Sequence, residues 1–157
     1  MTQKEIDTIL LHLEHAPDLV VPLVRDVPRD RLKERPAPGQ WSAHEHACHL
    51  AVVDKVMSAR LDQMLEETHP QISSYEPGRN DDPDELLMMD FDASLKRYVE
   101  GRNKLIERLS QLTLEQWART ADHIEYNSYS IFIMFRHLAM HDLFHAYRIE
   151  EILLQPS

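Results

Sequence analysis

The sequence predicts an all-α protein, a four-helix bundle with long connections. The composition favours helices over a turn-rich β architecture, because only 3 of the 157 residues are glycine and Leu, Glu, Met and Ala are common. Four long segments also repeat apolar residues with the period of an amphipathic helix. One chain of this size can bury a single core, so we expect one helical-bundle domain spanning residues 1–157. The long links between the segments favour at least one crossover connection.

The first two helices have clear sequence signals. The first should run over residues 3–24, where two internal prolines are expected to kink or divide it. After a proline-rich link, the stretch WSAHE predicts a helix start, because Ser42 as N-cap and Glu45 three residues later can form a capping box. This second helix should continue to about residue 67.

The second half of the chain begins with the loop HPQISSYEPGRNDDP, which is long enough to be a lid or part of a site. The third helix should start at Asp82 and Pro83, since proline suits the first helical position. The stretch TLEQW reads as a short extra turn. The fourth helix should begin near Ser128 or Ser130 and end near Leu154. EYNSYSIFI is rich in strand-forming residues, but it has no evident partner strand, so we expect loop and helix start there.

Charge and cysteine content exclude several classes of function. The formal net charge of −10 and the pI near 5.4 disfavour binding to nucleic acid, because no basic patch offsets the acidic field. The apolar runs are short and the N-terminus lacks a signal-peptide pattern, so we expect no membrane association. Cys48 is the single cysteine and cannot form an intrachain disulfide; we expect it to be a small buried side chain. These features predict a cytoplasmic protein.

The stretch FRHLAMHDLFHAYRI places three histidines, His137, His141 and His145, on one stripe of the fourth helix. The outer two lie about 12 Å apart along the axis. Metal–nitrogen bonds are only about 2 Å long, so at most two of the three can bind one ion. His145 lies within the apolar arc, His141 lies at its edge and His137 falls further outside. The pair expected to face the bundle is therefore His141 and His145.

A third ligand must come from another helix, and the second helix carries His44, His46 and His49. His44 points away from the apolar arc and is expected to be solvated. His46 sits near the centre of that arc and His49 at its edge, so periodicity slightly prefers His46 and leaves both open. Burying either imidazole without a metal or a hydrogen-bond partner would be costly.

Two longer stretches, RPAPGQWSAHEHACHLAVVD and HLAMHDLFHAYRIEEIL, together resemble the DinB/YfiT-like superfamily over nearly the whole chain. The shared pattern is a proline-containing link, Trp-Ser, a Glu and then His-Leu, followed later by His-x-x-x-His. The resemblance implies a four-helix bundle in which three histidines, here His49, His141 and His145, hold a divalent metal. One departure is Arg148, where many members carry Gln.

Three neutral imidazoles leave a divalent ion its full charge and at least one open coordination position. Such an ion can lower the pKa of bound water, polarise a carbonyl or hold a thiolate. Imidazole suits several metals, and we expect zinc or nickel. Arg148 is the candidate for binding a substrate carboxylate, although a surface or interface ion pair is the more common role for such an arginine. No nucleophile motif is present, so the sequence assigns no catalytic residue.

The function predicted first is a metal-dependent, hydrolase-like enzyme acting on a small molecule. The alternatives are a thiol S-transferase of the same superfamily and a non-catalytic, metal-stabilised dimeric binding or stress-response module. A homodimer is expected, because the fourth helix also carries Met140, Leu143, Phe144 and Tyr147 outside its inner arc. Cover by the first helix or by the long loops is the alternative.

Overall fold

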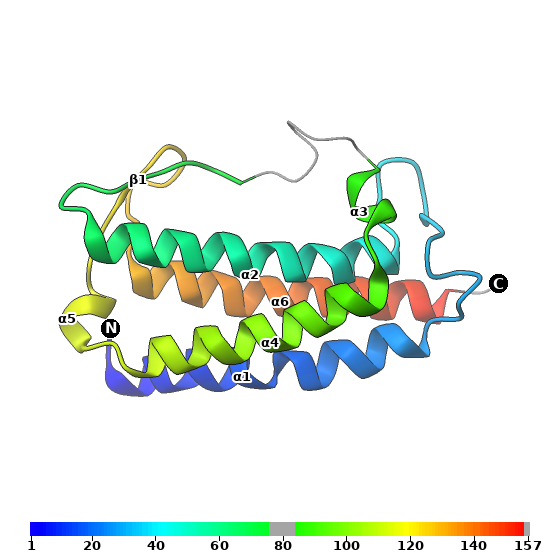
Figure 1. The fold of residues 1–157 in the computed structure, drawn as a ribbon, viewed down its shortest axis with the longest axis horizontal. Coiled ribbons are helices and arrows are strands. Elements are labelled where there is room, and N and C mark those ends of the chain that lie inside the picture. Colours follow the sequence, from blue (N-terminus) through cyan, green and yellow to red (C-terminus); the bar gives the residue numbers. More distant parts are fainter. Residues whose placement is uncertain (76–83, 156–157) are drawn as a thin grey trace.

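Four long helices form the bundle in the computed structural model, which describes residues 1–75 and 84–155. They are α1 (Gln3–Asp26), α2 (Ala43–Glu66), α4 (Phe91–Ser110) and α6 (Ile131–Leu154), and they lie side by side in Figure 1. The short helices α3 (Glu85–Met88) and α5 (Leu114–Trp117) and the strands β1 (Gln71–Ile72) and β2 (Asp122–His123) belong to the connections. The predicted all-α bundle is confirmed. None of the described helices is both long and apolar enough to cross a bilayer.

The connection between α2 and α4 is the crossover that the long links predicted. Both helices begin at the same end of the bundle in Figure 1, where the rings of His44 and Phe91 stack with centroids 5.7 Å apart. The two helices are therefore parallel, and the chain must return along the length of the bundle before α4 begins. α6 runs antiparallel to α2, which allows side chains near the start of α2 to meet side chains near the middle of α6.

Helix starts follow the capping signals of the sequence. The Ser42 hydroxyl accepts a hydrogen bond from the Glu45 backbone N–H at 3.2 Å, and the Glu45 carboxylate accepts from the Ser42 N–H at 2.8 Å, as the capping box predicted. Ser130 caps α6 by accepting from the Ile133 N–H at 3.2 Å. α1 remains one helix across its two prolines.

The third helix differs from the prediction of one continuous helix from Asp82 and Pro83. Those two residues lie outside the described part of the chain. The described part contains the short α3 and then a break before α4. The Asp90 side chain accepts a hydrogen bond from the Ala93 N–H at 2.7 Å, so this residue starts a new helix instead of continuing the old one. The predicted turn at TLEQW is confirmed as α5.

A small parallel sheet, which the sequence did not indicate, joins two connections. β1 pairs with β2 in the register Gln71–Asp122 and Ile72–His123. The Gln71 side-chain amide donates to the Asp122 carboxylate at 2.7 Å. The stretch EYNSYSIFI is loop and helix start, as predicted, apart from an isolated bridge between Thr120 and Ser130. The sheet fixes the segment after α2 against the segment before α6.

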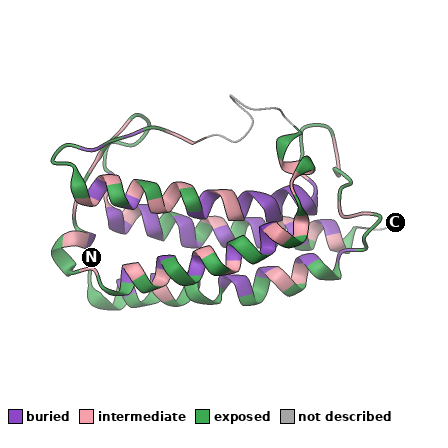
Figure 2. Cartoon of the chain, viewed as in Figure 1, coloured by how far each residue is buried: buried purple, intermediate pink, exposed green. Residues whose placement is uncertain are grey.

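The core consists of two apolar clusters separated by a polar layer. On each long helix, one end packs in the first cluster and the other end in the second, so that buried residues line the inner faces in Figure 2. Several buried polar residues of α2, α4 and α6 lie between these two ends; among them are Asp54, Arg102, Asp142 and His145, with His46 and His49 nearby. This layer crosses the middle of the bundle and contains the candidate site.

Candidate metal centre

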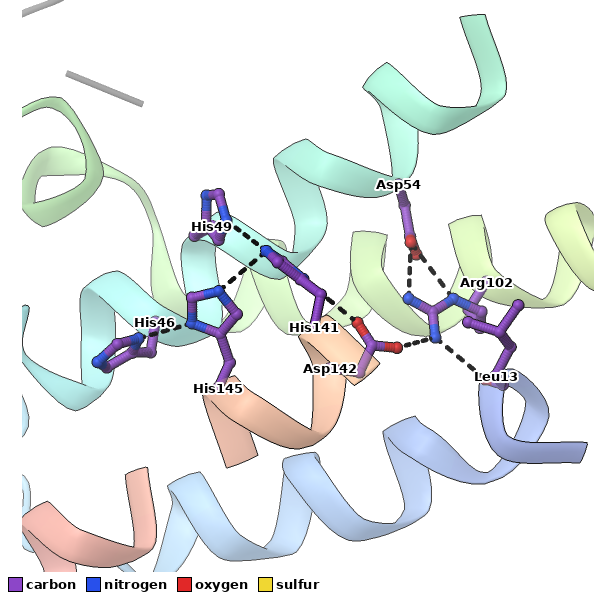
Figure 3. A network of polar contacts seen from close by, with 8 residues as sticks. All are labelled: Leu13, His46, His49, Asp54, Arg102, His141, Asp142 and His145. Atoms are coloured by element: carbon purple, nitrogen blue, oxygen red, sulfur yellow. Dashed lines mark hydrogen bonds and ion pairs between the residues drawn. The ribbon is translucent and has the colours of Figure 1, made fainter. Parts of the chain in front are cut away.

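Three imidazoles meet in the polar layer, one from α2 and two from successive turns of α6. The Nε2 atom of His141 lies 3.1 Å from Nε2 of His49 and 3.0 Å from Nε2 of His145. Ligand atoms of the three residues all lie within 4.8 Å of one another, and Figure 3 shows the rings converging. The expected set of His49, His141 and His145 is thus brought together by the fold.

The spacing and protonation of these imidazoles fit a divalent ion. Two nitrogens bound to one ion at about 2.0–2.1 Å in tetrahedral geometry would lie about 3.4 Å apart, close to the separations observed. Burial, with a smaller effect of the neighbouring histidines, lowers the pKa of His49 to about 3. The same two causes hold the pKa of His145 well below its usual range. Both rings are therefore neutral at physiological pH, as metal ligands must be.

His46 supports this set without joining it. Its Nδ1 atom lies 2.7 Å from Nδ1 of His145, so the two rings share a hydrogen bond on the side of His145 away from the cluster. If Nε2 of His145 is to face an ion, Nδ1 must carry the proton and donate to His46. Burial lowers the pKa of His46 to about 4, which keeps it a neutral acceptor. This contact favours His49 over His46 as the third ligand, and the assignment of the ligands stays a prediction.

Two further residues lie at the start of α2. Trp41 covers the site, with its ring centroid 4.8 Å from that of His49 and 5.9 Å from that of His145. The prediction that His44 is solvated is wrong. His44 is buried, because the start of α4 packs on this side of α2 and Phe91 stacks on the imidazole. Its pKa is lowered by that burial.

A buried ion network adjoins His141. Arg102 of α4 donates to the Asp54 carboxylate of α2 at 2.7 Å, and it also pairs with Asp142 of α6. Its guanidinium donates to the Leu13 carbonyl of α1 at 3.1 Å. Burial raises the pKa of Asp54 to about 6, against the opposing effect of Arg102. Sequence reasoning missed this network, although all three charged residues occupy apolar-stripe positions of their helices.

Asp142 connects the ion network to the histidines. Its Oδ1 atom lies 3.9 Å from Nδ1 of His141, and neither atom has a hydrogen-bond partner among the described residues. A movement of about 1 Å would bring the two atoms within hydrogen-bond distance. Carboxylates commonly orient a ligating imidazole in this way, by accepting from the nitrogen that does not face the metal.

A cavity of about 210 Å³ opens beside the cluster, with His49 and His141 in its wall. His137, which the helical stripe had placed outside the ligand set, lines the same cavity without joining the cluster. Arg148, predicted to bind substrate, does not line it and pairs with Glu151 at 2.6 Å. Its role in substrate binding stays a prediction. The other lining residues include Arg60, Ser74, His123, Glu125, Tyr126 and Tyr129.

Comparison with known proteins identifies the family and the fold. The family model of the DinB superfamily matches residues 12–149. YfiT from Bacillus subtilis, a probable metal-dependent hydrolase with an unusual four-helix bundle topology, is similar in structure with a TM-score of 0.87 at 20% identity, covering 97% of this chain and 87% of YfiT. The DinB-like protein YjoA from Bacillus subtilis has a TM-score of 0.62 at 17% identity, with 93% and 90% of the two chains covered. A search of curated proteins gives no significant match.

Metal binding is the first testable consequence. Protein purified without a histidine tag should contain about one divalent ion per chain by elemental analysis. His145→Ala should remove most of that metal, because one of three facing nitrogens is lost. His137→Ala is the matched control from the same helix and should retain the ion. Full metal content in His145→Ala, or its loss in His137→Ala, would mean that another set of ligands binds the ion.

The second testable consequence is that the two carboxylates that pair with Arg102 have different effects on metal binding. Asp142→Asn should weaken metal affinity by about 10- to 100-fold, because an amide oxygen orients the His141 ring less strongly than a carboxylate. Asp54→Asn removes the other carboxylate of the same buried network but forms no ion pair with a histidine of the site. It should keep metal affinity within a few-fold of the unaltered protein. Competition titrations with a metal-sensitive dye would measure both, and an equal loss would indicate a purely structural network.

Proposed function

The chain belongs to the DinB superfamily, and from that premise we propose that it is a metal-dependent, hydrolase-like enzyme acting on a small molecule. The observation that carries the proposal is the convergence of three imidazole Nε2 atoms at the wall of a cavity. When bound there, a divalent ion would supply Lewis-acid chemistry, either by lowering the pKa of water or by polarising a carbonyl. We propose zinc or nickel as that ion, since imidazole ligands suit both.

The residues around the cluster support a catalytic role over a purely structural one. A structural site would be closed by a fourth protein ligand. Glu45 is engaged by Arg35, which donates to its carboxylate at 2.5 Å, and by the capping bonds to Ser42. His46 is engaged by Nδ1 of His145. Within the described residues the cluster therefore has three members, and two of them are in contact with the cavity.

The chain's own residues would have distinct roles in such a site. Trp41 would shield the imidazole rings from water on the side where it packs. His46 would hold the tautomer of His145, and Asp142 would orient His141. The similarity to YfiT, a probable metal-dependent hydrolase, supports hydrolysis as the reaction.

The reaction can be tested with a panel of small esters, amides and electrophilic acceptors, each assayed with and without a low-molecular-weight thiol. We expect hydrolysis that requires metal, proceeds without thiol and falls at least about 100-fold in His141→Ala, because a ligand in the cavity wall is lost. His12→Ala, on an exposed position of α1, is the control and should retain activity. Turnover only in the presence of thiol would identify a transferase instead. A fully ligated metal without any activity would identify the non-catalytic module.

We also propose that the protein is a homodimer formed through α6. Met140, Leu143, Phe144 and Tyr147 form one stripe at helical spacing, and each is between 45% and 60% exposed. Neither α1 nor the described loops cover this stripe. A second copy of the same helix would bury it in an isologous contact, in which the same apolar stripe is used by both subunits.

Light scattering at micromolar concentration should therefore give a dimeric mass. Leu143→Glu should shift the mass to that of a monomer, because a charge would be buried in the contact. Leu114→Glu is the matched control, since Leu114 is a leucine of α5 with a similar exposure of 52%. A monomeric mass for the unaltered protein would refute the dimer.

A further inference from the structure

Arg60 lines the cavity that His49 and His141 share. Its Nη2 atom donates to the Ser73 carbonyl at 2.6 Å. Across the described residues, no carboxylate lies within ion-pair distance of this guanidinium. Arg148 differs, because Glu151 already pairs with it. A guanidinium fixed in a cavity wall with unused donors is suited to bind a carboxylate or a similar anion.

Other donors surround Arg60. Ser74 is the next residue after Ser73, whose carbonyl accepts the Arg60 hydrogen bond. The Ser74 hydroxyl is shielded from solvent and lacks a hydrogen-bond partner within the described chain. A buried hydroxyl without a partner is costly, so a ligand that accepts its hydrogen bond gains affinity. Tyr129 also lines the cavity beside Arg60. Burial raises the pKa of Tyr129, against the effect of Arg60, so its hydroxyl is protonated.

An aromatic wall continues from these donors. The ring of His123, on β2, lies 4.6 Å from the rings of both Tyr126 and Tyr129. The two tyrosine rings lie 6.2 Å apart and are nearly parallel, with an interplanar angle of 7°. Such a surface favours a flat, partly apolar group over a flexible polar chain. A cavity of about 210 Å³ also restricts the ligand to a small molecule.

We propose that the substrate is a small planar carboxylate, whose anionic group is bound by Arg60 and the Ser74 hydroxyl and whose planar body packs against Tyr129 and His123. The reacting group would then face His49 and His141. This assignment rests on the proposed function and names the substrate class for that site. Glu125 lines the same cavity as an exposed acid and opposes the binding of an anion, so its removal should strengthen binding.

The test compares benzoate with benzamide, which has nearly the same shape but no charge. Titration calorimetry would use the metal-loaded protein and the same protein after treatment with a chelator. In both forms benzoate should bind about tenfold more tightly than benzamide, the difference expected for a charge-assisted contact. Arg60→Gln should remove this preference, and Arg60→Lys should keep much of it. Arg108→Gln, which removes an arginine that pairs with Asp62 and does not line the cavity, should leave it unchanged, and Glu125→Gln should increase it.

The Arg60 variants also lose the bond to Ser73, so Ser74→Ala provides an independent measure. It leaves that bond in place and should weaken benzoate binding about threefold without affecting benzamide. Equal binding of benzoate and benzamide, or an unchanged preference in Arg60→Gln, would overturn the proposal. A preference for benzoate seen only in the metal-loaded form would place the carboxylate on the ion, which overturns the Arg60 assignment while leaving the metal centre intact. If the unaltered protein takes up no divalent metal and still shows the preference, the proposed function is refuted while the Arg60 assignment stands.

Discussion

The Arg102 guanidinium links all four long helices of this bundle. It comes from α4, donates to a backbone carbonyl of α1 through Leu13, and pairs with Asp54 of α2 and Asp142 of α6. Removing one partner of a buried ion pair typically costs about 3–5 kcal/mol, because the remaining charge stays buried. These contacts fix the polar layer midway along the bundle axis, and the two apolar clusters pack on either side of it.

The same layer places the histidines. Asp142 follows His141 directly in the chain. Because Asp142 pairs with Arg102, that ion pair also fixes the position of the α6 turn that carries His141. His145 is one turn further along and is held by His46 from α2. The geometry of the candidate metal centre thus depends on contacts made behind the three histidines, away from the cavity. This arrangement explains why so many polar groups are buried in a small helical domain, where burial without a partner would be destabilising.

The sequence predicted the helices and the ligands from α6 because both depend on local periodicity. The capping box at Ser42 and the i, i+4 spacing of His141 and His145 are local features, and the structure confirms them. The choice between His46 and His49 depended on how α2 rotates against α6, which no local pattern specifies. The burial of His44 was not predicted for the same reason. His44 lies outside the apolar arc of α2, but the start of α4 packs on that face of the helix.

The sequence indicated that the loop after α2 could be part of a site, and Ser74 of that loop lines the cavity, but the other members of the lining could not be predicted, for a different physical reason. The cavity lining combines α2 and α6 with Ser74, from the loop after β1, and His123, from β2, and the pairing of these two-residue strands brings them together. Strands this short carry no alternating pattern, so their pairing could not be inferred. The buried charges did leave a signal: Asp54, Arg102 and Asp142 all interrupt apolar stripes, where a charge requires a partner.

The central claim is that the Nε2 atoms of His49, His141 and His145 share one divalent ion. Anomalous diffraction from crystals of the metal-loaded protein, recorded at the absorption edge of that metal, tests it most directly. One anomalous peak should lie about 2.0–2.2 Å from all three Nε2 atoms, with His46 still bonded to Nδ1 of His145. A peak ligated by His46, by His137 or by residues elsewhere in the chain would contradict the account.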